Sequence, residues 1–100
     1  MASMDTSSEA APDSGWLSET EQADGVGQRL EVMRRQTNAA QRSAAQTFEQ
    51  SAQSHDRTAA SYDKLARQGH TEASEHAARH REFAEEDRQI AHRLRKMADR

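Results

Sequence analysis

Small and apolar residues recur along this chain at helical intervals, with one interruption at Gly69. Between residues 33 and 66 they follow a 4-3-4 spacing, which repeats every eleven residues and is typical of a nearly straight helix. Between residues 73 and 97 the spacing alternates 3-4, which is a heptad pattern. The first series is Met33, Thr37, Ala40, Ala44, Phe48, Ser51, His55, Ala59, Tyr62 and Ala66, and the second is Ala73, His76, His80, Phe83, Asp87, Ile90, Leu94 and Met97. The two series predict two long helices, each with one face turned toward a neighbour.

We therefore expect an all-α fold, an antiparallel helical hairpin with a long helix at about residues 28–68 and a second at about 72–98. Gly69 suits the left-handed position that ends a helix, and Thr71, followed by Glu72 and Glu75, is typical of a helix start. The composition agrees, because the chain has 18 alanines and few β-branched residues. We expect such hairpins to associate as a helical bundle.

The first 24 residues differ from the rest, since they carry six acidic residues and no basic one. They also contain the only proline, Pro12, and we expect a largely disordered acidic tail. Ser18 and Glu21 form a capping-box pattern that predicts a short helix from Glu19. Gly25 and Gly27 should interrupt this helix. The predicted organisation is a tail at 1–24 and a hairpin at 25–100.

The two expected helices differ in length, and this difference indicates an interaction function. At 1.5 Å per residue the first would be roughly 60 Å long and the second roughly 40 Å, so part of the first lacks an intramolecular partner. That part holds Val26, Leu30 and Met33, and the tail holds the apolar pair Trp16 and Leu17. We expect these five residues to contact a second copy in a homodimer, or another protein, so that the chain acts as a non-enzymatic interaction or regulatory module.

The histidines suggest an alternative function, a metal- or ligand-responsive helical protein. His76 and His80 are four residues apart on one helical face, which can place two imidazoles on one metal ion, and Asp63 should lie opposite His76. His55 and Asp87 form a second candidate pair, because both lie on the expected contact faces and a buried carboxylate needs a partner. We interpret this second pair as a polar contact that fixes the register of the helices.

Other functions find less support in the sequence. The basic residues near the C-terminus are diluted by acids and the pI is about 5.9, which argues against nucleic-acid binding. No apolar run is long enough to span a membrane, no signal-peptide pattern follows Met1, and there is no cysteine. We therefore expect a cytoplasmic protein that is not an enzyme, has no membrane partner and needs no cofactor.

The run Ala-Ala-Arg-His-Arg-Glu-Phe-Ala-Glu-Glu-Asp at residues 77–87 resembles small Ala/Arg/His-rich helical-hairpin proteins of actinobacteria. Those proteins are mostly uncharacterised. The resemblance implies a hairpin architecture over about residues 40–100 and an actinobacterial source, but it implies no activity.

Overall fold

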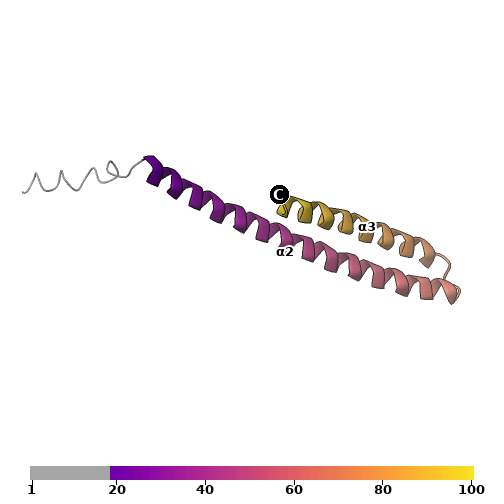
Figure 1. The fold of residues 1–100 in the computed structure, drawn as a ribbon. Coiled ribbons are helices and arrows are strands. Elements are labelled where there is room, and N and C mark those ends of the chain that lie inside the picture. Colours follow the sequence, from indigo (N-terminus) through magenta and orange to yellow (C-terminus); the bar gives the residue numbers. More distant parts are fainter. Residues whose placement is uncertain (1–18) are drawn as a thin grey trace, which may run out of the picture. The chain divides into compact units, whose positions relative to one another are not determined.

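The computed structural model describes residues 19–100, and these contain two helices (Figure 1). Helix α2 spans Glu19–Arg67 and helix α3 spans Ala73–Ala98. The described residues divide into two units, residues 19–35 and residues 36–100. Within residues 36–100, α2 and α3 run antiparallel and side by side (Figure 1). The predicted helical hairpin is confirmed.

Helix α2 begins at Glu19 and runs without a break through Gly25 and Gly27, so the predicted interruption at these glycines is wrong. Glu19 and Glu21 lie in its first turn, where their negative charges interact favourably with the positive end of the helix dipole. Neither glycine has a positive φ. A glycine costs a helix about 1 kcal/mol relative to alanine, which the helix-forming residues around it can outweigh.

The turn between the helices depends on Gly69, as the sequence predicts. Its φ is 106°, a left-handed conformation that costs other residues energy. The amide of His70 donates to the carbonyl of Leu65 at 3.1 Å, and the amide of Gly69 donates to the carbonyl of Ala66 at 3.1 Å. This pair of bonds is a Schellman motif, which satisfies the last carbonyls of α2. The chain then enters α3 at Ala73, whose amide donates to His70.

The buried residues of the hairpin are all alanines. Within the part of the chain that the structure describes, every buried residue is an alanine, and no larger side chain is fully buried. Alanine side chains allow two helix backbones to approach closely, so the contact is tight but buries little apolar area. We call the heptad-spaced members the alanine seam: Ala45, Ala52 and Ala59 of α2, and Ala77, Ala84, Ala91 and Ala98 of α3.

The alanine seam corrects the predicted contact faces. On α2 the buried residues recur every seven positions, not every eleven, and Met33, Thr37 and Ala40 are exposed. On α3 every second predicted position is displaced by one residue, so that Ala84 is buried in place of Phe83. The physical reason is that the helices approach most closely where side chains are smallest, which leaves the larger side chains beside the contact.

Candidate interaction surface

The two edges of the hairpin, on either side of the alanine seam, have different chemistry. Successive residues of a helix are rotated by about 100°, so residues four after an alanine lie on one side of it and residues three after it lie on the other. In an antiparallel pair, equal offsets on the two helices meet at the same edge. One edge therefore collects the four-after positions, and the opposite edge collects the three-after positions.

Three ion pairs between the helices form the first edge, which we call the charged edge. Asp63 pairs with Arg81, and seven residues along each helix Asp56 pairs with Arg88. The third pair repeats this interval, with Nε of Arg95 3.0 Å from Oε2 of Glu49. All three pairs are solvent-accessible, so each contributes little stability, and they recur every seven residues along both helices.

The arginines also shift the titration of two of these carboxylates. The hydrogen bond from Arg81 lowers the pKa of Asp63 below its ordinary value, with its positive charge adding to the effect. The hydrogen bond from Arg95 lowers the pKa of Glu49 in the same way. In turn the pKa values of both arginines are raised, mainly by the same hydrogen bonds.

Rings and apolar side chains form the opposite edge, which we call the apolar edge. Nδ1 of His55 lies 2.8 Å from Nδ1 of His80, so one imidazole donates a hydrogen bond and the other accepts it. Tyr62 stacks on His76 and on His80, with centroid distances of 5.0 and 5.7 Å. The apolar edge consists of Phe48, His55 and Tyr62 of α2 and His76, His80, Phe83, Ile90, Leu94 and Met97 of α3, and it also includes the carboxylate of Asp87.

The predicted pair of His55 and Asp87 does not form. His55 pairs instead with His80, where the neighbouring Tyr62 and Phe83 rings favour stacking. Oδ2 of Asp87 is buried and has no hydrogen-bond partner among the described residues. The sequence correctly places both residues at the helix contact, but the spacing alone does not show which side chain His55 reaches.

The predicted metal ligands are not assembled either. Asp63 belongs to the charged edge and binds Arg81, whereas His76 and His80 belong to the apolar edge. Residues 19–100 contain no group of three or more histidine, aspartate or glutamate side chains that could hold a metal ion. The imidazoles of His55 and His80 would supply two ligands, where a tetrahedral site needs three or four.

In residues 19–35, the predicted interaction residues are exposed on α2. Val26, Leu30 and Met33 keep 45, 58 and 59% of their surface accessible, and Val32 keeps 49%. A shallow groove of about 500 Å³ lies among Gly25, Gln28, Arg29, Val32 and Met33. The other two predicted interaction residues, Trp16 and Leu17, lie outside the described residues.

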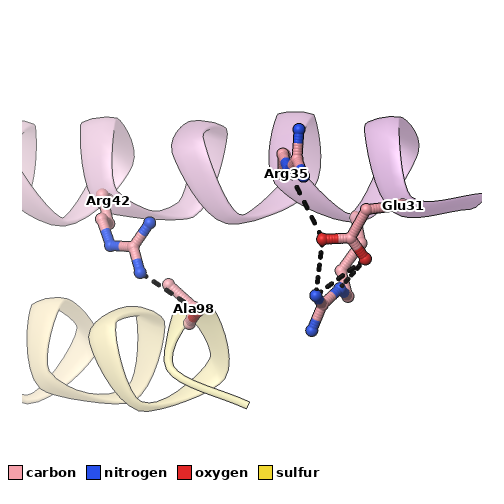
Figure 2. Close-up of polar contacts among 5 residues, drawn as sticks. Glu31, Arg35, Arg42 and Ala98 are labelled. Atoms are coloured by element: carbon pink, nitrogen blue, oxygen red, sulfur yellow. Dashed lines mark hydrogen bonds and ion pairs between the residues drawn. The ribbon is translucent and has the colours of Figure 1, made fainter. Parts of the chain in front are cut away.

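Arginines on α2 make polar contacts in both units, as Figure 2 shows. In residues 19–35, Glu31 accepts hydrogen bonds from Arg34 and lies 3.4 Å from Nε of Arg35, and these contacts lower the pKa of Glu31. In residues 36–100, Nη2 of Arg42 donates to the carbonyl of Ala98 at 3.4 Å, which caps the end of α3 (Figure 2).

Large apolar side chains remain accessible on residues 36–100 as well. Phe83 and Met97 of the apolar edge are 39 and 42% exposed, and Leu65 is 40% exposed. This division into a small buried contact and larger exposed residues was not predicted, although the alanines that recur every seven positions on both helices are visible in the sequence.

No helix in the described part of the chain combines the length and the apolar character that crossing a membrane requires. Comparison with known proteins adds no relative, since no family model matches the chain and neither the curated proteins nor the solved structures give a significant match.

Proposed function

We propose that this protein is a non-enzymatic interaction module that self-associates through the apolar edge of its hairpin. The observation that supports this is the inverted distribution of apolar side chains: the buried residues are alanines, while Phe83, Met97 and Leu65 stay accessible. Burial of an alanine methyl group contributes about 0.8 kcal/mol, whereas a buried phenylalanine or methionine contributes about 1.5–3 kcal/mol. About two fifths of the surface of each of these large apolar residues is therefore still exposed to water.

The occupant that we propose for the apolar edge is a second copy of the chain. Apolar residues recur every seven positions along this edge on α3, and Phe48 and Tyr62 lie along it on α2, which is the pattern expected of helices in a four-helix bundle. Two copies related by a twofold axis would each cover the edge of the other and bury the same residues twice. The charged edge, with its ion pairs, would stay in water on the outside.

Absolute mass over a range of concentrations, measured by light scattering on the full chain, tests this proposal. We expect a dimer in wild type and a monomer in Phe83→Asp, because a carboxylate on the apolar edge would be buried without a partner. The matched control is Ala78→Asp, which introduces the same side chain at an exposed position of α3 away from the apolar edge. A wild-type monomer at all concentrations, or equal dissociation of both variants, would refute the proposal.

A further inference from the structure

The outward-facing charges of α3 are separated along its length. Four charged residues form ion pairs with residues of α2, and they are Arg81, Arg88, Arg95 and Asp99, the last with Arg42. Among the charges that make no ion pair with α2, residues 75–86 contribute four acids and one base, whereas residues 93–100 contribute three bases. These residues are Glu75, Arg79, Glu82, Glu85 and Glu86 in the first group and Arg93, Lys96 and Arg100 in the second. The outer face of α3 is thus acidic toward its start and basic toward its end.

The apolar residues of α3 are arranged symmetrically within this charge pattern. Phe83, Ile90 and Met97 recur every seven positions, so Ile90 lies midway between the other two. Glu86 and Arg93 lie beside this row, on its outward side, and Ile90 is also close to their midpoint. A twofold axis through Ile90 would therefore exchange an acidic position with a basic one, and Phe83 with Met97.

From this arrangement we infer that two copies associate through antiparallel α3 helices centred on Ile90, with Glu86 of each copy facing Arg93 of the other. This inference rests on the proposed self-association and specifies its geometry. A parallel arrangement would place Glu86 against Glu86 and Arg93 against Arg93, which is repulsive. The antiparallel one replaces both of these repulsions with two equivalent attractions, while Arg79 and Arg100 meet a like charge in either arrangement.

The surface around Met97 supports the same alignment. A shallow depression of about 310 Å³ lies among Arg93, Lys96, Met97 and Arg100. In the antiparallel arrangement this depression is level with Phe83 of the second copy. An exposed aromatic ring and a depression of this kind are complementary elements of an interface.

Charge exchange tests the inference. Each single variant, Glu86→Arg and Arg93→Glu, replaces two attractive contacts of the dimer with two repulsive ones, and we expect the dissociation constant to rise roughly tenfold at low salt. The double variant Glu86→Arg/Arg93→Glu restores opposite charges and should return close to the wild-type value. Both differences should shrink at 1 M salt, where screening acts over about 3 Å.

Sedimentation equilibrium of the full chain gives the dissociation constants, and circular dichroism checks that each variant keeps its helical content. Glu82→Arg is the matched control, because it reverses the same charge at a position that lies further around α3 from the row at Phe83. A wild-type dimer whose affinity is unchanged in both single variants would overturn the antiparallel inference and leave the proposed self-association intact. A wild-type monomer would instead refute self-association itself.

Discussion

Ala84→Leu should destabilise the hairpin, although it adds apolar surface. Ala84 is 0% exposed and occupies the middle of the alanine seam on α3. Leucine adds three carbon groups, which could contribute up to about 2.4 kcal/mol if they were buried without strain. The seam has no room for them, so α2 and α3 would have to move apart.

The cost of that movement follows from the other seam alanines. The six remaining members of the seam contribute together about 5 kcal/mol, at about 0.8 kcal/mol for each buried methyl group. A gap of 0.5–1 Å already loses a quarter to a half of each contact, which amounts to about 1–2.5 kcal/mol. The new side chain would gain little at a widened contact that also admits water. Overpacking typically costs 1–3 kcal/mol, and we expect a net loss of about 1–2 kcal/mol.

Thermal unfolding followed by circular dichroism at fixed protein concentration measures this change. A loss of about 1–2 kcal/mol should lower Tm by roughly 5–15 °C in a domain of this size. Ala78→Leu on the exposed face of the same helix is the control and should leave Tm nearly unchanged. A higher Tm in Ala84→Leu than in Ala78→Leu would refute the reasoning, since it would mean that the helices separate without cost.

Three further predictions concern the turn, the charged edge and residues 19–35. Gly69→Ala should lower the unfolding free energy by about 1–2 kcal/mol in thermal or urea unfolding, because the φ of 106° is strained for alanine even though the added Cβ would meet no atom within 4 Å. Acidification should remove the stability supplied by Glu49 and Asp63, because folding lowers the pKa values of both carboxyl groups. This contribution is complete above the pKa values of the unfolded chain, near about 4, and is lost as the pH falls from there through the lower pKa values of the folded chain. A pH titration of helicity should therefore be shallower in Arg81→Gln/Arg95→Gln, and an identical acid transition would contradict the assignment. Leu30→Asp should weaken self-association in sedimentation experiments, because Leu30 is 58% exposed, and an unchanged dissociation constant would confine the contact to residues 36–100.

The sequence was sufficient to predict the hairpin, because its signals are local. Gly69 is the only residue with a positive φ in the described part of the chain, and it lies where the helical spacing breaks. The effect of Gly25 was overestimated, because α2 runs through it without a break. A single glycine carries a cost that a long helix can absorb, so it marks an end only where the backbone must become left-handed.

The composition of the helix contact was less accessible to sequence reasoning. Large apolar residues are usually taken to mark the buried face, and this placed Phe83 and Met97 in the contact instead of Ala84 and Ala98. Both choices give heptad spacing, and they differ by one residue, a rotation of about 100°. The partner of His55 could not be predicted for a related reason, since His80 and Asp87 are both within reach of a residue on the facing helix.

The alanine seam fixes how closely the helices approach, but it cannot fix their register. A shift of one helix by seven residues would bring alanines back onto alanines, and it would still allow Glu49 to meet Arg88 and Asp56 to meet Arg81. Such a shift would lose one ion pair, which is worth at most about 1 kcal/mol at an exposed site. The turn at residues 68–72 opposes the shift, because its hydrogen bonds fix where α3 starts relative to the end of α2. The Schellman motif at Gly69 therefore determines which side chains share the apolar edge, including the contact of His55 with His80 and the placement of Phe83. On this argument, a lengthened turn should alter self-association even if every residue of the apolar edge is kept.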